Sequence, residues 1–289
     1  SFVPGHLLIL ITMKPVRHNR PYPLFSLDWA SFILYSFVVV SFGYLMVYGQ
    51  ERYWFSDSSL LNILVGGILL LGLFIIRQKA TKRVYIELSI FGNKKFLLGI
   101  LVLYMMYIER FSLTISNQYF LQVIHLDPIH LSYIQWFNIL GIVSGVMLSL
   151  YWLLKRRTVK WIWVIGYCCL LVFHQYLFFS FESEGNEEHF WLPLVLHGLG
   201  VGLIMVPTIL FVIASVPPQL GASAAAACLA VRYMGYTSSI GLQNFFRLFE
   251  HAQHREVFRD QLQPSNPIFE NYLQLESHRV MHQGLLVKQ

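Results

Sequence analysis

Long apolar runs dominate this sequence and constrain its fold more than any other feature. Seven of them approach or exceed the roughly 20 residues that a helix needs to cross the hydrocarbon core of a bilayer. They cover 29–49, 58–76, 97–121, 131–154, 161–181, 190–215 and 221–248. These runs predict an all-α integral membrane protein with seven complete transmembrane helices.

The share of charged residues leads to the same class of protein. It is 12% of 289 residues, whereas 56% are hydrophobic, and a soluble domain usually carries about 25% charged residues. The net charge of +6 does not indicate nucleic-acid binding, because Lys and Arg stand in short clusters between the apolar runs. Cys168, Cys169 and Cys228 lack the spacing of a metal site and are predicted to be small apolar fillers. No metal or cofactor is expected.

The division of the chain follows from these runs. Residues 1–13 are apolar, too short to span and without an initiator Met, so we expect the end of a truncated span. Residues 14–95 are predicted to hold a cytoplasmic loop, two central spans and an interfacial segment at 84–95. Residues 96–249 form five spans of a C-terminal bundle. Residues 250–289 are predicted to be a truncated polar external loop, which Pro264 and Pro267 break into two short helical stretches. A fragment lacking its other bundle is not expected to transport alone.

The distribution of Lys and Arg predicts the orientation. The loops 14–28, 77–95 and 155–160 carry thirteen of them, whereas 50–57, 122–130 and 182–189 carry only Arg52. Positive charge in short loops marks the cytoplasmic side, so the basic loops are predicted to be cytoplasmic.

Glu109 and Arg110 are the main candidates for chemistry, since they fall in the middle of the 97–121 run. An ionisable side chain at that depth costs about 2.5–3.5 kcal/mol on insertion scales. Burial disfavours the carboxylate anion, so Glu109 is a candidate to bind and release a proton or to hold a cationic substrate. The alternative is a fixed ion pair that locks helix packing.

Other polar residues within the runs are further candidates. Arg232 follows the small-residue run 221–227 and is predicted either to neutralise a carboxylate or to extend to lipid headgroups. His197 and His174 are interpreted as packing residues for which a proton-relay role stays open. Asn117 and Asn138 are expected to line a cavity or to join helices by hydrogen bonds. Tyr107 and Tyr233 are among the aromatic residues that favour packing or a pocket for an apolar cation.

An enzymatic alternative rests on one short external loop. It contains His125 and Asp127, and membrane acyltransferases use His and Asp. Because Pro128 interrupts the segment, the two side chains do not share a helix face.

Four patches carry a family resemblance. They are Leu27-Asp28-Trp29 with the stretch 48–56, the segment 87–96, His197-Gly198-Leu199-Gly200-Val201-Gly202 with Pro207, and Arg232-Tyr233-Met234-Gly235 with Gly241. In their order and spacing they resemble the fourteen-span drug:proton antiporter family of the major facilitator superfamily. Ser31 stands where the family has Gly, and the loop 153–157 lacks the family's Asp.

The resemblance implies a C-terminal fragment of a major facilitator-type helical bundle. It further implies a bacterial inner (plasma) membrane location and proton-coupled export of amphipathic or drug-like compounds. Gly198, Gly200, Gly202, Pro207, Gly235 and Gly241 would be its helix-packing residues. The implied partners are the lipid bilayer, a small amphipathic substrate and protons. Some relatives also assemble with a periplasmic adaptor, and no nucleic acid is expected.

Overall fold

The computed structural model describes residues 28–81, 84–180, 187–261 and 276. The predicted partial span 1–13, most of the first loop and residues 262–275 and 277–289 of the predicted tail lie outside the described residues.

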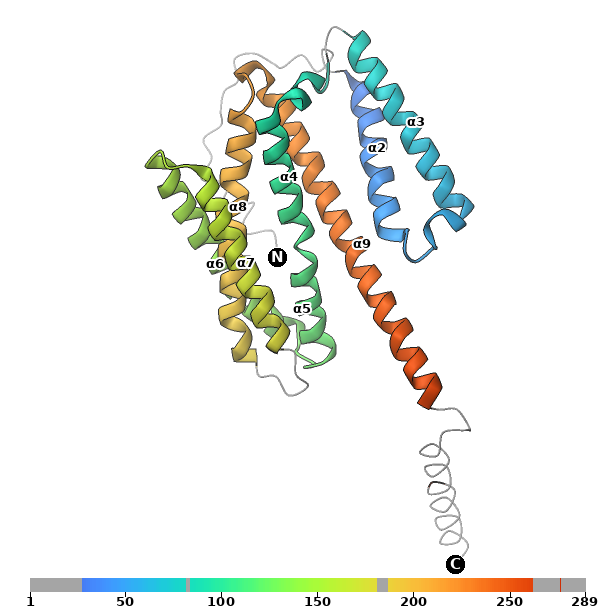
Figure 1. The fold of residues 1–289 in the computed structure, drawn as a ribbon, viewed down its shortest axis with the longest axis vertical. Coiled ribbons are helices and arrows are strands. Elements are labelled where there is room, and N and C mark those ends of the chain that lie inside the picture. The colour runs from blue at the N-terminus through green and yellow to red at the C-terminus, as the bar shows by residue number, and fades with distance from the viewer. Residues whose placement is uncertain (1–27, 82–83, 181–186, 262–275, 277–289) are drawn as a thin grey trace, which may run out of the picture.

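The described chain is helical and contains no strand (Figure 1). Four short 3-10 helices, η2, η3, η4 and η5, lie at Trp54–Ser56, Leu88–Gly92, Glu187–Phe190 and Pro218–Leu220. The α-helices are α2 (Trp29–Tyr48), α3 (Ser58–Ala80), α4 (Lys94–Ile108), α5 (Phe111–Gln122), α6 (Pro128–Leu154), α7 (Val159–Ser180), α8 (Trp191–Ala214) and α9 (Gly221–Gln261).

Six helical stretches among the described residues are long and apolar enough to cross a membrane. They are α2, α3, α4 with α5, α6, α7 and α8 with the preceding η4. Their length and composition indicate a multi-pass membrane protein. Large apolar side chains such as Leu154, Phe178 and Leu171 are exposed on them, as is expected where a helix faces lipid.

The seventh predicted span, 221–248, lies within α9 but is not among these six. Many of its residues are small or polar, and the helix continues through charged residues to Gln261, beyond the predicted boundary at 249. Figure 1 shows α9 extending past the end of the bundle. The crossing by α9 therefore stays a prediction.

Short polar side chains fix where several helices begin. Asp28, Asp57, Asn93 and Asp127 each accept a hydrogen bond from a backbone N–H of the first turn that follows. Such N-caps satisfy donors that have no partner within the helix. Each of these residues lies one to four positions before a predicted apolar run, and this explains why the helix starts lie close to the predicted ones.

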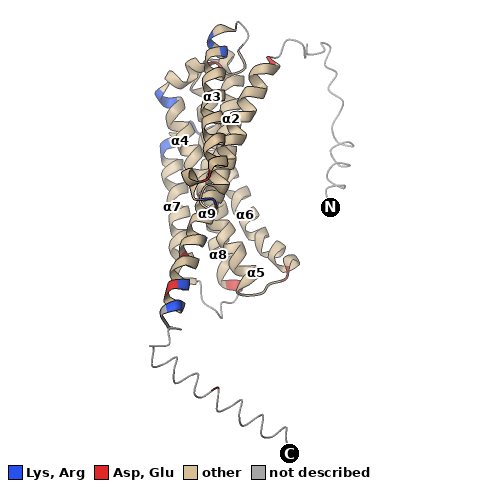
Figure 2. Cartoon of the chain, turned by 90° about the vertical axis from the view of Figure 1, so that its right-hand side faces the viewer, with Lys and Arg blue, Asp and Glu red and all other residues tan. Residues whose placement is uncertain are grey.

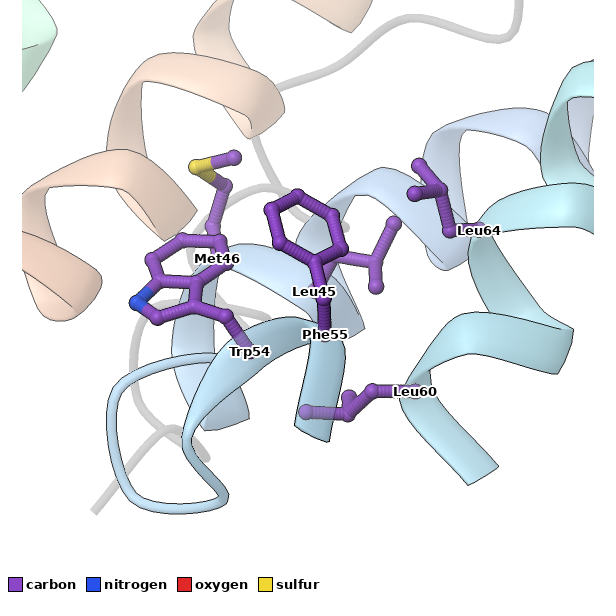
Figure 3. Close-up of a pocket in the computed structure, with 6 residues that line it drawn as sticks. All are labelled: Leu45, Met46, Trp54, Phe55, Leu60 and Leu64. Atoms are coloured by element: carbon purple, nitrogen blue, oxygen red, sulfur yellow. The ribbon is translucent and has the colours of Figure 1, made fainter. Parts of the chain in front are cut away.

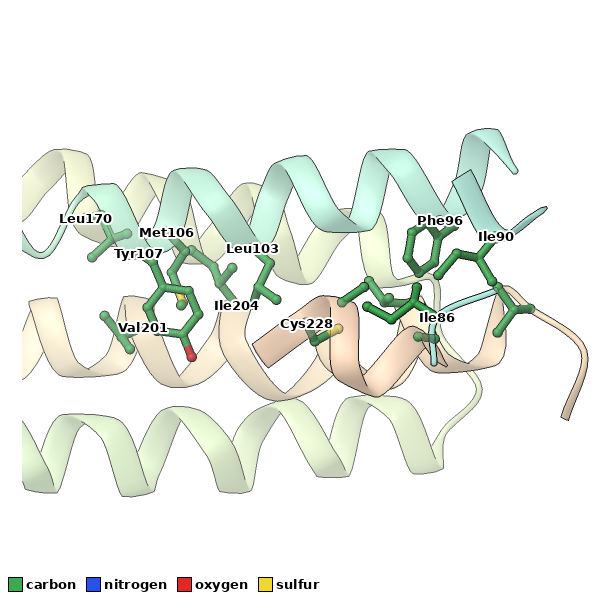
Figure 4. Close-up of a cluster of buried hydrophobic side chains, with 14 of the residues drawn as sticks. Ile86, Ile90, Phe96, Leu103, Met106, Tyr107, Leu170, Val201, Ile204 and Cys228 are labelled. Atoms are coloured by element: carbon green, nitrogen blue, oxygen red, sulfur yellow. The ribbon is translucent and has the colours of Figure 1, made fainter. Parts of the chain in front are cut away.

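Helix α8 is the centre of the larger group of helices. More than half of its apolar stretch is buried, a larger share than in any other span of the described residues. It contacts α6, α7 and α4, while α9 packs between α4 and the α2–α3 hairpin. The core includes Phe96, Leu103, Met106 and Ile204 (Figure 4).

Helices α6 and α8 approach each other unusually closely at two points. A Cβ added at Gly198 would lie 2.0 Å from the Asn138 carbonyl oxygen, and one at Gly145 would lie 2.5 Å from the Leu199 carbonyl oxygen. Small residues permit such backbone approach between membrane helices. Gly235 and Gly241 occupy similar positions on α9, where an added Cβ would meet Tyr107 and the Met46 carbonyl oxygen.

Residues 84–93 form only the short helix η3 within irregular backbone, and Lys94 and Lys95 are the first residues of α4. Ile86 and Ile90 are buried in the core. The side-chain oxygen of Gln78 accepts hydrogen bonds from the backbone N–H groups of Tyr85 and Ile86. The segment is thus tied to the end of α3 and to the helices beside it.

Candidate functional site

The apolar run 97–121 is divided by a break at Glu109 and Arg110, between α4 and α5. The backbone N–H of Ser112 donates to the Glu109 carbonyl, three residues back, instead of four. The run is therefore not the single regular helix that its sequence predicts. Glu109 follows the last residue of α4, and its side chain turns toward α7 and α8.

Five side chains from the α4–α5 break, α5, α6, α7 and α8 converge here. We call them the Glu109 cluster: Glu109, Ser112, Asn138, His174 and His197. The Glu109 side chain is 12% exposed and that of His197 only 3%, whereas that of His174 is 39% exposed. His174 is thus the more accessible of the two histidines.

Glu109 is contacted by both histidines. Its Oε2 lies 3.3 Å from Nε2 of His197, and its Oε1 lies 3.7 Å from Nε2 of His174. The first distance suits a hydrogen bond, but the two atoms are not aligned for one, and neither has another hydrogen-bond partner among the described residues. The Ser112 hydroxyl is 3.0 Å from Oε1 and 2.8 Å from the Glu109 carbonyl oxygen, and can donate to either.

The far nitrogen of each histidine has its own partner. Nδ1 of His197 lies 2.7 Å from the amide nitrogen of Asn138, and Nδ1 of His174 lies 2.7 Å from the Leu170 carbonyl oxygen. Each ring is therefore held on the side away from Glu109. Among the described residues, no group of three or more His, Cys, Asp or Glu side chains is arranged to hold a metal ion.

The structure separates the predicted site residues into two groups. Glu109, Asn138 and His197 come together in the cluster. Arg110 and Arg232 instead line an open hollow between α4 and α9. Asn117 belongs to neither, because its side-chain oxygen accepts a hydrogen bond from Gln135 at 2.6 Å and so joins α5 to α6.

Ser112 was not predicted as a site residue, and His174 was predicted mainly as a packing residue. Ser112 lies three positions after Glu109, so helical spacing alone places it near that side chain. For His174 the proton-relay role was left open, but nothing in its own run favours that role over packing. The signal was the depth shared by three ionisable residues on three apolar runs, which becomes a contact only once the helices are packed.

An apolar pocket lies beside the turn that joins α2 to α3 (Figure 3). It has a volume of about 170 Å³ and is lined by Leu45, Met46, Trp54, Phe55, Leu60 and Leu64. A binding site usually combines apolar walls with a few polar groups that orient the ligand. Since the lining here is apolar, this pocket is a weaker candidate than the Glu109 cluster.

The residues of the enzymatic alternative lie in an exposed turn. Asp127 caps α6 by accepting from the backbone N–H of Ile129 at 3.3 Å. His125 is exposed and has a positive φ of 56°. A helix cap accounts for Asp127 without any catalytic role.

Comparison with protein-family models and with curated proteins finds no match for this chain. The resemblance to the drug:proton antiporters therefore stays a prediction from the motifs, and the function has to be argued from the geometry of the cluster.

Proposed function

We propose that this chain belongs to a secondary active transporter that couples the export of small amphipathic compounds to protons. The observation that carries the proposal is the Glu109 cluster. A carboxylate inside a membrane span is costly unless it is paired or functional, and this one faces two titratable rings. The resemblance to proton antiporters points the same way but adds no independent observation.

The hydrogen bonds of the histidines define where protons reside. An amide nitrogen only donates, so Nδ1 of His197 accepts from Asn138, and the proton of the neutral ring is on Nε2, toward Glu109. A carbonyl only accepts, so Nδ1 of His174 carries a proton. The Nε2 lone pair of neutral His174 then faces Glu109.

This arrangement leaves a place for one further proton. With both rings neutral and Glu109 ionised, the bare Nε2 of His174 faces a carboxylate oxygen at 3.7 Å, which is unfavourable. A proton on either His174 or Glu109 relieves that repulsion. In this proposal His174, the less buried of the two rings, is the group through which this proton enters and leaves.

The cluster links proton binding to helix movement. Its members come from α5, α6, α7, α8 and the break that ends α4. Gain or loss of the proton changes the attraction between these helices, and a ligand or proton shifts a conformational equilibrium by its different affinity for the two states. Secondary transporters place their substrate and coupling-ion sites near the bilayer midplane, and Glu109 falls in the middle of its span.

The test uses the intact protein, wild type and Glu109→Gln, in liposomes that contain a pH-sensitive dye. Proton flux is measured on addition of a panel of amphipathic cations, neutral compounds and anions. We expect at least one compound to drive proton flux in the wild type. Glu109→Gln should insert at normal abundance and lose that flux or its pH dependence. Glu188→Gln, the same change at an exposed position, serves as the control.

Two outcomes would count against the proposal. A fall in folded protein for Glu109→Gln, with flux per folded molecule retained, would make Glu109 a structural partner of the histidines. Normal abundance with unchanged flux would remove it from the mechanism.

A further inference from the structure

The second group of predicted residues forms the arginine hollow, which opens between α4 and α9. It has a volume of about 440 Å³ and is lined by Tyr107, Arg110, Leu229, Arg232, Tyr233 and Tyr236. The Arg232 guanidinium lies over the Tyr107 ring, 6.0 Å from its centroid. The hollow thus combines two guanidinium groups with three phenol rings.

The charge of this hollow is not compensated by the described part of the chain. No Asp or Glu is among its lining residues, and Glu109 is directed to the histidines instead. Arg52, Arg77 and Arg247 each reach a carboxylate, whereas Arg110 and Arg232 form no ion pair with any described residue. A cation is therefore an unsuitable ligand for this hollow, and this argues against the alternative of an aromatic pocket for an apolar cation.

The depth of the hollow excludes ordinary lipid headgroups as its counter-charge. Arg110 lies near the middle of the span Lys94–Gln122, and Arg232 reaches the same level through Tyr107. Headgroups lie about 15 Å from the midplane. Arginine at such depth is costly and is found facing a partner, a cavity or a substrate path.

We infer that the arginine hollow binds an amphipathic aromatic anion, a carboxylate or a sulfonate. This inference deepens the proposed function, on which it rests, by naming the class of substrate. Two guanidinium groups offer forked N–H donors that match the oxygens of such an anion. The tyrosine rings can pack against an aromatic body, and the volume suits a small ligand.

The experiment measures binding to the intact protein in nanodiscs of phosphatidylcholine, by calorimetry. The probes are naphthalenesulfonate, the neutral naphthalenesulfonamide and the cationic naphthyltrimethylammonium. We expect naphthalenesulfonate to bind about tenfold or more tightly than the cation, and Arg110→Gln or Arg232→Gln to weaken it by about tenfold each. Arg156→Gln, in the α6–α7 loop, should leave its affinity unchanged.

A second pair of variants guards against misfolding. Arg110→Lys and Arg232→Lys keep the charge but lose the fork, so they should bind the sulfonate with intermediate affinity. Equal affinity for all three probes, or sulfonate binding that the glutamine variants do not weaken, would overturn the inference. So would competition by phosphatidylglycerol in the nanodiscs at the same two arginines, since the occupant would then be a lipid.

Failure here is distinguishable from failure of the proposed function. If the sulfonate does not bind but another compound drives proton flux that depends on Glu109, the proposed function is supported and the assignment of an anion to the hollow is wrong. If the sulfonate binds at the arginines but no compound drives proton flux, the anion site is supported and the proposed proton-coupled transport is wrong.

Discussion

Glu109 and Arg110 are neighbours in the chain, yet their charges serve different surroundings. The carboxylate faces His174 and His197, and the guanidinium faces the hollow beside α9. Adjacent positions on a helix point about 100° apart, and so two ionisable residues side by side could be predicted not to pair simply with each other. Which helix each one would meet could not, because that depends on packing between runs far apart in the sequence.

A polar network separate from the Glu109 cluster and the arginine hollow joins the start of α2 to the end of α3. The Asp28 Oδ1 accepts from the Arg77 guanidinium at 2.7 Å, and the Ser31 hydroxyl bonds to Asp28 and accepts from Arg77 at 3.1 Å. Ser31, which departs from the family pattern, is fully buried in this network. Burial raises the pKa of Asp28, but the hydrogen bonds from Arg77 and Ser31 outweigh it and hold the pKa below its ordinary value of 3.8.

The Asp28 network predicts a pH-dependent stability. Because the pKa is lower in the folded state, the stabilisation is present above pH 3.8 and is lost as the pH falls through the folded-state pKa. Asp28→Asn keeps the helix cap and loses the ion pair, so we expect a loss of about 1 kcal/mol at pH 7. Thermal unfolding followed by tryptophan fluorescence should show the difference from wild type closing in the acid range. Asp57→Asn, at an exposed cap, should have a smaller effect, and a gap independent of pH would contradict the assignment.

At the scale of the elements, the closest contact is that between α6 and α8. Gly141 and Gly145 on α6 face Gly198 and Gly202 on α8. The four-residue spacing of each pair places both glycines of a pair on one face of a helix, so a small-residue interface is readable from the sequence. That α6 pairs with α8 cannot be predicted from the sequence. This pairing positions part of the Glu109 cluster, because Asn138 and His197 each lie one turn or less from the contact and hydrogen-bond across it.

Gly198→Ala tests that interface. The added Cβ would fall 2.0 Å from the Asn138 carbonyl oxygen, and backbone cannot move aside as a flexible side chain can. We expect a loss of about 1–3 kcal/mol or failure to fold, seen as lower abundance and a lower unfolding temperature. Gly66→Ala on α3 is the matched control, since nothing lies within 4 Å of its added Cβ. Similar behaviour of the two variants would show that α6 and α8 do not approach so closely.

At the scale of the whole molecule, the charges divide along the long axis. Figure 2 shows Lys and Arg of the bundle gathered toward one end, with further ones along the last turns of α9.

The helix positions could be predicted because apolar runs and N-capping residues are local signals. The break at Glu109 could not be predicted, since the residues around it include no Gly or Pro. A short helix before Pro264 was predicted, but not that it would continue α9 without interruption to Gln261.

The orientation and the crossing by α9 can be tested together with topology reporters fused to the intact protein. A reporter after Arg157 should be cytoplasmic and one after Glu188 external, because basic loops are retained inside. A reporter after Gln261 decides the seventh crossing. The α8–α9 connection lies at the same end of the bundle as the start of α4 (Figure 1), so a spanning α9 places Gln261 on the side of Glu188. Reversal of the first two readings would overturn the orientation. A cytoplasmic reading at Gln261 together with an external one at Glu188 would mean that α9 does not cross, and the arginine hollow would then lose the membrane depth on which its assignment rests.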